Sequence, residues 1–529
     1  MEIALHPEIH TYSGGLGILA GDTARSAADL ELPMAFVTLI SRQGYMRQEI
    51  DASGVQTEHA DPWDPPAHAT PLRAKVAVTI GGREIWIRPW LHVLCSAIGQ
   101  TIPVLLLDTD LDENHPDDRR ITDRLYGGDQ AYRLRQEIVL GIGGVRALQA
   151  IGFDIQRYHL NEGHAALLAL DLLRRHPRPA DQVRAGEIKY DVGHVRRCCV
   201  FTTHTPVEAG HDRFDYGLVA ELLGNYVELE QIKLLAGADR MNMTHLALQL
   251  SGYVNGVAAR HAQTTTRMFP GYRIRAVTNG IHVATWAHRD FAAMYNRRFS
   301  AWAYEPEVMV RADQLPDSEV WDAHQRAKQD LIELVRMRSG CDFDPEVPTI
   351  GFARRMTAYK RPELLFSDLA KLTAIGAKHP FQVVLAGKAH PNDTAGKHHI
   401  EAIHRHIETL KGRVRVCYLA GYDMTLAKTL VSGVDIWLNT PVPPMEASGT
   451  SGMKAALNGV LNLSVLDGWW LEAWIEGVTG WSIGEDGAAQ VSADHLYGKL
   501  QDAVLPLYYT DRDRWIWMMK QAISKIACY

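Results

Sequence analysis

Short apolar runs rich in β-branched residues alternate along the chain with longer stretches in which apolar residues recur every three or four positions. The first pattern is typical of buried strands and the second of amphipathic helices. In the first half we expect strands over residues 34–40, 76–80, 102–107 and 200–203, and helices over residues 130–151, 165–175 and 244–260. This alternation predicts an α/β sheet domain.

A second series of strands and helices follows a charged amphipathic stretch over residues 317–339. Its strands are expected over residues 349–352, 382–385, 414–418 and 435–438, and its helices from Pro362 and near residues 397–410. No short-period repeat or flexible linker separates the two halves. We therefore predict two α/β domains, residues 1–325 and 326–529, with ligands at the carboxyl ends of their strands.

Composition and charge exclude several classes of protein. The 529 residues are 46% hydrophobic and 22% charged, which excludes disordered and collagen-like chains. The net charge is −7 and no basic stripe is present, so nucleic acid is not an expected partner. Because there is no long apolar run and no signal peptide, we expect no membrane contact and a cytoplasmic protein. The six cysteines are scattered without a CxxC motif, so neither a metal site nor a disulfide framework is predicted.

The sharpest local feature is the small-residue segment Glu446–Lys454, with the sequence EASGTSGMK, between a predicted strand and a predicted helix. Small residues before a helix expose backbone N–H groups to an anion, and the helix dipole adds to the attraction. The spacing is not that of a Walker A loop. Lys454 would lie beside a bound phosphate, where its amine could form a Schiff base with pyridoxal phosphate. The alternative is a Gly-rich turn with a surface lysine.

A cationic cluster over residues 354–361 comes directly after the predicted strand 349–352. Loops at the carboxyl ends of strands hold ligands in this architecture, and the planar arginine fork suits phosphate. The cluster therefore predicts a second phosphate contact, and the alternative is a solvated basic loop.

A Gly-rich turn and three polar segments complete the candidate chemistry. Gly14 and Gly15 do not meet the GxGxxG spacing, but they let backbone amides approach an anion or a sugar closely. Polar residues also follow or interrupt apolar runs at residues 159–164, 202–206 and 278–282. Three such segments at strand ends favour a shared polar cleft over three separate turns.

Together and in order, six segments resemble the glycogen/α-glucan phosphorylase family, in its short bacterial and archaeal branch. The resemblance covers most of the chain, and EASGT followed by Met-Lys is its most specific part. The matching segments are residues 12–22, 159–164, 202–204, 278–281, 354–361 and 446–454. The resemblance implies the GT-B fold, which is two Rossmann-like domains facing across a cleft.

The resemblance assigns each candidate residue a role. It implies that pyridoxal 5′-phosphate is the cofactor, held by Lys454, Thr450, Ser451, Arg354 and Trp286. It implies substrate-binding roles for Gly14, Gly15, Asn279, Glu446, Ser448, Gly449, Asp129 and Glu162, with Asp129 in a gate loop over the site. It implies catalytic roles for Lys454, Arg355, Lys360 and His204.

The chemistry that the resemblance implies is phosphorolysis of an α-1,4-glucan such as glycogen or maltodextrin. Inorganic phosphate would protonate the glycosidic oxygen and capture C1 with retention, while the cofactor phosphate exchanges a proton with it. The products would be α-glucose 1-phosphate and a glucan shortened by one unit. Many relatives are dimers, so a homodimer is expected.

Departures from the family keep two alternatives open. Relatives continue beyond both ends of this chain, and we expect apolar surface around Trp515, Trp517 and Met518–Met519 to be left uncovered. A catalytically inactive glucan-binding relative is therefore one alternative. The other is a nucleotide-sugar-dependent GT-B glycosyltransferase similar to glycogen synthase, which would need no Schiff-base lysine.

Overall fold

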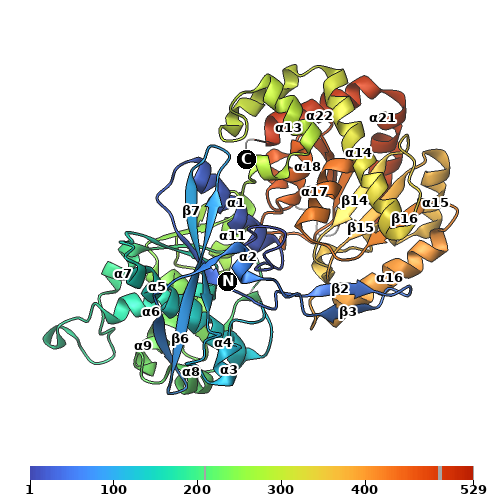
Figure 1. Cartoon of the computed structure of the whole chain (residues 1–529). Helices are drawn as coiled ribbons and strands as arrows, with labels where there is room; N and C mark the ends of the chain where they lie inside the picture. The colour runs from blue at the N-terminus through green and yellow to red at the C-terminus, as the bar shows by residue number, and fades with distance from the viewer. Residues whose placement is uncertain (208–209, 486–490, 528–529) are drawn as a thin grey trace. The chain divides into compact units, whose positions relative to one another are not determined.

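The computed structural model describes residues 1–207, 210–485 and 491–527, and the chain divides into two compact units (Figure 1). The first unit comprises Met1–Met46 and Ala60–Val277, and the second comprises Arg47–His59 and Thr278–Tyr529. Residues 278–325, which the sequence placed with the first domain, thus lie in the second unit. The reason is packing, because α12 (Val283–Trp286) contacts α18 (Ser451–Leu457) and α13 (Arg289–Arg298) contacts α14 (Asp317–Ser339).

The first unit contains one mixed sheet and one parallel sheet. In the mixed sheet β1 (Phe36–Leu39) runs parallel to β7 (Thr101–Asp108), and β7 pairs antiparallel with β6 (Arg83–Cys95). β4 (Thr70–Pro71) and β5 (Val76–Ile80) both pair antiparallel with β6. The parallel sheet has the order β13 (Arg275–Ala276), β12 (Tyr253–Gly256), β9 (Cys199–Thr202) and β8 (Tyr158–Asn161). The predicted strands 34–40, 76–80, 102–107 and 200–203 are confirmed.

Two of the three helices predicted in the first unit are confirmed and one is partly wrong. Residues 130–151 form α4 (Gln130–Ile138) and α5 (Gly144–Ile151), joined by the π-helical segment Val139–Gly143, and residues 167–174 form α6. The helix predicted over 244–260 ends early, because α10 (Met243–Leu250) is followed by strand β12. Apolar spacing alone did not separate these two elements, and the strand forms because residues 253–255 pair with residues 200–202 of β9.

The second unit is built on one six-stranded, fully parallel sheet. The strand order is β16 (Arg415–Leu419), β15 (Gln382–Ala386), β14 (Thr349–Ala353), β17 (Ile436–Asn439), β18 (Leu461–Val465) and β19 (Gly480–Ile483). Numbered along the chain, this order is the doubly wound 3-2-1-4-5-6 arrangement, whose crevice for ligands lies where the order reverses. Here that point lies between β14 and β17. The four strands predicted in this half are confirmed.

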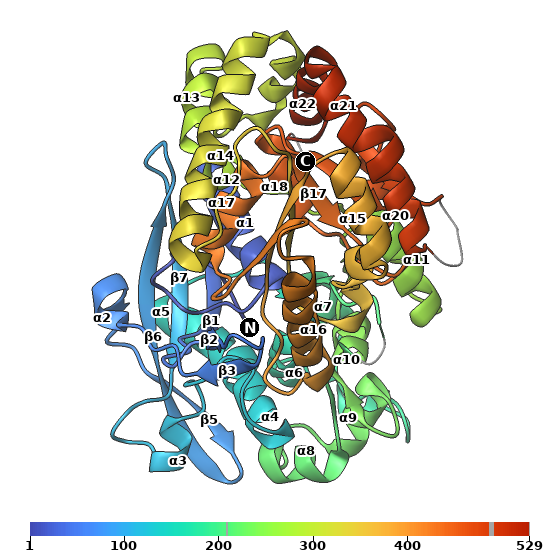
Figure 2. The ribbon, with the colours of Figure 1, turned by 90° about the vertical axis from the view of Figure 1, so that its right-hand side faces the viewer.

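Helices cover both faces of this sheet, so its strands are buried on both sides. Helices α14, α17 (Met424–Gly433) and α18 pack on one face, and α15 (Leu369–Lys378), α16 (Thr394–Leu410) and α20 (Ala493–Lys499) pack on the other (Figure 2). The helix predicted near 397–410 is confirmed in α16. Among the described residues, no helix is long and apolar enough to cross a membrane.

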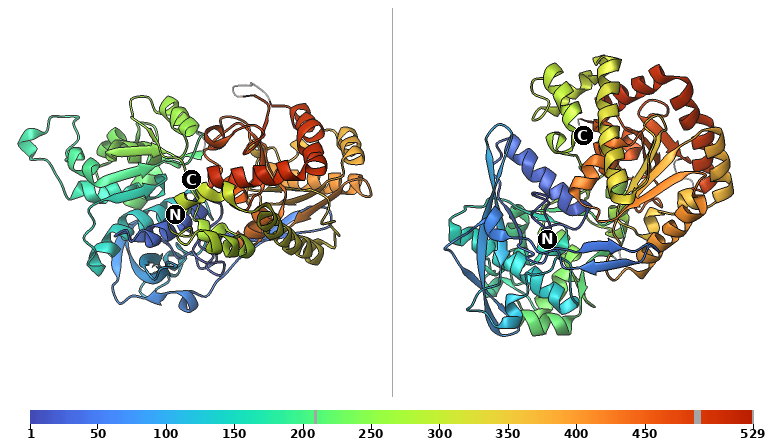
Figure 3. Two further views of the ribbon diagram at one scale, coloured as in Figure 1. Left: turned by 90° about the horizontal axis from the view of Figure 1, so that it is seen from above. Right: turned by 45° about the vertical axis from the view of Figure 1, so that its right-hand side comes forward.

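The last helix, α22 (Arg512–Ile526), corrects the expectation of uncovered apolar surface. It packs against the segment Pro306–Gln314, α14 and α18, and it is the red helix near the C-terminus in Figure 3. Trp515, Met518 and Met519 are fully or almost fully buried in these contacts, and Trp517 is half-buried. The prediction was wrong because the segment between α13 and α14, which carried no clear pattern in the sequence, supplies the cover.

A hairpin from the N-terminal part of the chain belongs to the second unit. Its strands are β2 (Arg47–Ile50) and β3 (Gln56–His59), and its turn at Gly54 lies against His404 of α16 (Figures 1 and 3). The Gln48 side chain donates to the carbonyl of Gly387 at 2.9 Å, and Gln56 makes the same contact with the carbonyl of Ala389. These bonds hold the segment after β15, in which the carbonyl of Lys388 accepts the N–H of Met356 at 3.0 Å.

Candidate active site

Two loops at the switch point of the six-stranded sheet bring opposite charges together. The loop after β14 carries Arg354 and Lys360, and the loop after β17 carries Glu446. Arg354 Nη1 donates to Glu446 Oε2 at 3.1 Å, and Lys360 Nζ donates to the same oxygen. Because all three side chains are about nine-tenths buried, this is a nearly solvent-free ion triad. The structure thus brings together residues that are 86 or more positions apart in the sequence.

Burial and the charges of neighbouring groups shift the pKa values of Lys360 and Glu446. Burial and the neighbouring Arg354 lower the pKa of Lys360 to about 8, although Glu446 opposes the shift. Burial alone would raise the pKa of Glu446, but the attraction of Lys360 and Arg354 outweighs it and lowers that pKa. Both groups are therefore charged near neutral pH, and the triad carries one net positive charge available to an anion.

Glycine lets the second loop fold tightly before α18. Gly449 has φ of 90°, and a Cβ there would lie 3.2 Å from the Glu446 carboxyl carbon. Thr450 follows as the N-cap of α18, and the Ser451 hydroxyl accepts a hydrogen bond from Trp437 Nε1 at 3.1 Å. The Ser448 hydroxyl is buried and has no hydrogen-bond partner within the described part of the chain. A buried orphan hydroxyl beside a helix N-terminus favours a polar ligand at this loop.

Lys454 lies on the first turns of α18 and is buried against an aromatic ring. Its Nζ is 3.8 Å from the ring centroid of Trp286, and both side chains are less than 7% exposed. The amide nitrogen of Asn458 donates to the carbonyls of Trp286 and Lys454, each at 2.9 Å. Asn458 thereby fixes α12 against α18 and holds the amine over the ring.

Two further predicted site residues of this unit are less buried: Arg355 lies at the surface and Asn279 lies in a partly buried loop. Arg355 is exposed, and its charge is one of those that lower the pKa of Lys360. Asn279 is half-buried in the loop before α12, next to Thr278, whose hydroxyl donates to Glu472 Oε2 at 2.6 Å.

In the first unit, the buried Glu162 and the half-buried His204 form a second polar pair. The His204 N–H donates to Glu162 Oε2 at 2.6 Å, and its Nε2 contacts the Asn161 side chain. Burial raises the pKa of Glu162 to about 7, and burial together with His261 lowers the pKa of His204 to about 3. Glu162 also adopts φ of 67°, a left-handed conformation that is uncommon for a side chain of this size. Strain and shifted titration at one residue are typical of functional sites.

The Gly-rich turn of this unit is held by a carboxylate that the sequence did not single out. Glu2 Oε2 accepts the N–H groups of Ser13 and Gly14 at 2.6 and 3.1 Å, at the N-terminus of α1 (Gly15–Asp29). Gly15 itself is exposed, and a Cβ there would meet nothing within 4 Å. Glu2 Oε1 also accepts the Tyr126 hydroxyl at 3.0 Å.

Asp129 caps α4, and a chain of contacts connects its loop to the buried histidines. The Asp129 side chain is exposed and accepts the Tyr132 N–H at 2.9 Å. Tyr126 packs edge-on against His164, with ring centroids 5.8 Å apart, and His164 lies 3.7 Å from Asp212. The charge of Asp212 in turn contributes to the raised pKa of Glu162.

Sequence reasoning missed Asp467 and Asn458, which hold the site of the second unit. Asp467 is fully buried after β18, and its carboxylate accepts the N–H of Glu446 at 2.8 Å. The signal for Asp467 was its Asp-Gly pair directly after an apolar run. Asn458 carried a weaker signal, an amide directly after a short helix.

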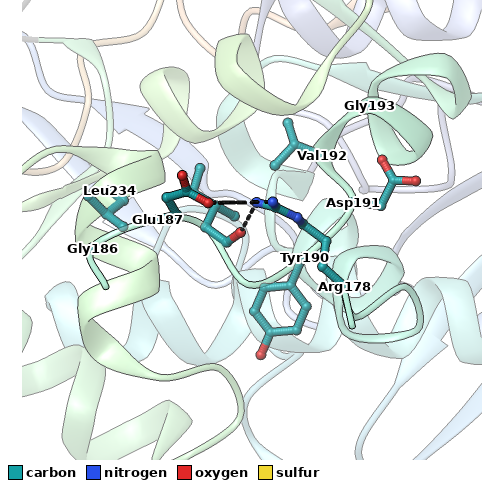
Figure 4. Close-up of a pocket in the computed structure, with 9 residues that line it drawn as sticks. Arg178, Gly186, Glu187, Tyr190, Asp191, Val192, Gly193 and Leu234 are labelled. Carbon is teal, nitrogen blue, oxygen red and sulfur yellow. Dashed lines mark hydrogen bonds and ion pairs between the residues drawn. The ribbon is translucent and has the colours of Figure 1, made fainter. Parts of the chain in front are cut away.

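The first unit also has a surface pocket of ≈ 630 Å³, and the residues that line it belong to none of these clusters (Figure 4). Arg178, Glu187, Tyr190 and Asp191 line it, and Arg178 donates to the carbonyl of Ile188 at 3.0 Å. None of the predicted site residues contributes to its lining.

Comparisons with known proteins find relatives along almost the whole chain. The model of the family described as carbohydrate phosphorylase matches residues 207–479. The chain is 37% identical to a maltodextrin phosphorylase of Thermococcus litoralis, over 100% of the chain and 68% of that protein. It is 34% identical to a glycogen phosphorylase of Aquifex aeolicus, over 99% and 82%. It is also 32% identical to an uncharacterized protein of Methanocaldococcus jannaschii, over 98% and 93%.

Proposed function

Because the chain belongs to the carbohydrate phosphorylase family, we propose that it is an α-glucan phosphorylase, a glycosyltransferase that cleaves α-1,4-glucans with inorganic phosphate. The product is α-glucose 1-phosphate, with retention at C1. The observation that carries the proposal is the buried triad of Arg354, Lys360 and Glu446, whose Glu446 lies on the loop that leads into α18, the helix that carries the buried amine of Lys454. The proposal includes the GT-B fold, and a homodimer stays a prediction.

The residues around Lys454 fit pyridoxal 5′-phosphate. Lys454 offers a buried primary amine, Trp286 a flat apolar surface, and Thr450 and Ser451 the N-terminus of α18. The orphan hydroxyl of Ser448 and the guanidinium of Arg354 supply further partners for an anionic group. When bound, the cofactor supplies a phosphate monoester whose second pKa near 6 allows proton exchange near neutral pH.

The triad supplies the electrostatics for a second anion. The side chains of Lys360 and Arg354 are about nine-tenths buried, and buried cations stabilise negative charge far more strongly than cations in water. Arg355, exposed on the same loop, extends this positive region toward solvent. These groups bind and orient inorganic phosphate, which delivers a proton to the glycosidic oxygen and then bonds to C1 of the glucosyl unit.

The other predicted site residues bind the glucosyl unit of the substrate through polar groups. Glu446, Ser448 and Gly449 offer a carboxylate, a hydroxyl and a backbone amide, and Asn279 an amide side chain. In the first unit, Gly14 and Gly15 present backbone amides, and His204 and Glu162 offer an imidazole and a carboxylate held in fixed positions. The raised pKa of Glu162 lets it donate or accept a hydrogen bond to a sugar hydroxyl near pH 7.

The test is phosphorolysis of maltodextrin by the full chain, with release of glucose 1-phosphate as the readout. Lys454→Ala should abolish both turnover and a chromophore that borohydride fixes to the wild-type chain, whereas Lys378→Ala, on an exposed face, should change neither. A wild-type chain that transfers glucose from a nucleotide sugar without any bound chromophore would favour the glycogen-synthase-like alternative. Glucan binding without turnover, in cofactor-loaded protein, would favour an inactive binding relative.

A further inference from the structure

Two histidines and a glutamate meet on the first unit, although they come from segments about sixty residues apart. His6 and Glu8 lie on the turn of the N-terminal segment, and His68 is the last residue of the short helix α2 (Pro65–His68). Each offers one ligand atom, and the three atoms all lie within 4.8 Å of one another. Figure 1 labels α2 in the blue N-terminal part of the chain.

The separation of two of these atoms matches the edge of a tetrahedral metal site. Glu8 Oε2 lies 3.4 Å from His68 Nε2 and 3.8 Å from His6 Nδ1. Ligand bonds of about 2.0–2.1 Å in a tetrahedron place neighbouring ligand atoms about 3.3–3.4 Å apart. The His6 ring, which is exposed, would therefore move toward the other two ligand atoms when the site binds an ion.

The two arms of the site are held in place by contacts outside the cluster. The ring of His68 packs against Trp63, with centroids 6.2 Å apart, and the carbonyl of His68 accepts a bond from His92 Nδ1 at 2.8 Å. The turn of the other arm is closed by the N–H of Ile9, which donates to the carbonyl of His6 at 3.0 Å. The Glu8 N–H donates a long hydrogen bond of 3.4 Å to His6 Nδ1, and a metal ion would replace this N–H at the lone pair of that nitrogen.

We propose that His6, Glu8 and His68 bind a divalent transition-metal ion, with zinc as the reference ion. Two neutral imidazoles and one carboxylate are borderline donors that suit zinc, and one carboxylate leaves the bound ion with a net positive charge. Because His6 and Glu8 are exposed, the fourth position is open to water.

The ion would fasten the N-terminal segment to α2. That segment is already held by other contacts, among them the one between His10 Nδ1 and the carbonyl of Asp61 at 2.9 Å. It also carries Glu2, whose carboxylate holds the amides of Ser13 and Gly14. The metal site thus adds a further anchor to the segment that supports the Gly-rich turn, and it stands whether or not the proposed activity is correct.

The experiment is a zinc titration of the full chain after removal of metals, with a chromophoric chelator as competitor. The wild-type chain should bind one zinc ion tightly, and His6→Ala, His68→Ala and Glu8→Gln should each weaken that site by at least about 100-fold, more than the loss typical of an outer-shell change. His10→Ala and the exposed His398→Ala are the controls and should bind as the wild type does. Equal zinc affinity in the wild type and all three ligand variants would overturn the proposal.

A spectroscopic measurement separates a lost ligand from a disturbed fold. Cobalt in place of zinc should give the intense visible bands of a four-coordinate site in the wild type and in His10→Ala, and lose them in His68→Ala. Circular dichroism of the metal-free proteins should be the same for all of them. A weak, six-coordinate cobalt spectrum in the wild-type chain would overturn the tetrahedral assignment.

Discussion

Replacement of Glu446 tests the charge balance of the proposed phosphate site most directly. Its buried carboxylate accepts hydrogen bonds from Arg354 Nη1 at 3.1 Å and from Lys360 Nζ. Glu446→Gln keeps the side-chain volume, so no cavity opens, but two buried cations lose their counter-charge. Breaking a buried ion pair by removing one partner costs about 3–5 kcal/mol, and we expect the unfolding free energy to fall by that amount.

Urea unfolding of the full chain, followed by tryptophan fluorescence, measures this loss because Trp437 and Trp469 are buried in the same unit. Glu408→Gln is the matched control, since Glu408 forms an exposed pair with Lys411 at 3.6 Å, and such pairs contribute about 0–1 kcal/mol. Adding Lys360→Met to Glu446→Gln should restore part of the stability, because one unpaired buried cation is removed.

Inorganic phosphate should also rescue Glu446→Gln if the two cations form an anion site. A ligand that binds only the folded chain stabilises it by about 2.7 kcal/mol at 100 times its dissociation constant. The reasoning is refuted if Glu446→Gln is as stable as Glu408→Gln, or if phosphate stabilises the control and the variant equally little.

Three further changes test titration and packing. The KM for phosphate should rise about tenfold per pH unit above pH 8, where Lys360 loses its proton, and Lys360→Arg should abolish that rise. In the folded state the pKa of Glu162 is about 7, above the ordinary 4.5, so the wild type loses stability as the pH rises between these two values. Glu162→Gln removes this titrating group. Its unfolding free energy at pH 8, measured with urea, should therefore exceed that of the wild type by up to about 3 kcal/mol. Asn458→Ala should lower the unfolding free energy by about 2–4 kcal/mol, because it removes the hydrogen bonds that Asn458 makes with the carbonyl of Trp286 and with the N–H of His288.

Each of these three substitutions has a control substitution at an exposed residue. Lys371→Arg should keep the wild-type dependence of the phosphate KM on pH, and an equal dependence in Lys360→Arg would contradict the assignment of Lys360. Glu228→Gln, in an exposed pair with Lys189, should leave the stability profile unchanged, and a Glu162→Gln profile parallel to the wild type would contradict the raised pKa. The exposed Asn392→Ala should be neutral, and a loss within about 0.5 kcal/mol for Asn458→Ala would rule out its bridging role.

Strand positions and motif positions could be read from the sequence, but the contacts between motifs could not. The strands of the second unit are runs of four or five residues buried on both faces, which is a strong local signal. That Arg354 meets Glu446 depends on β14 and β17 being neighbours, and this neighbourhood is set by the strand order of the sheet. Hydrophobic periodicity carries no information on strand order.

Residues with weak local signals were missed for a related reason. Glu2 and Asp467 act as buried acceptors of backbone N–H groups, and a single acidic residue near an apolar run looks the same in sequence whether it caps a loop or faces solvent. The hairpin Arg47–His59 was missed because its alternating polar residues bury two glutamine side chains against another segment, at Gly387 and Ala389. His6, Glu8 and His68 lacked any local metal spacing, since one ligand lies about sixty residues from the others.

The position of the triad explains how a phosphate site can persist in a folded chain before its ligand arrives. An isolated buried cation is costly, so neither Arg354 nor Lys360 would stay desolvated on its own. The switch point between β14 and β17 places a loop of positive charge beside a loop that carries one carboxylate, and that carboxylate neutralises only one of the two buried cations. The folded triad is thus stable without ligand yet still positive, and an arriving phosphate completes the neutralisation of cations that the fold has already desolvated.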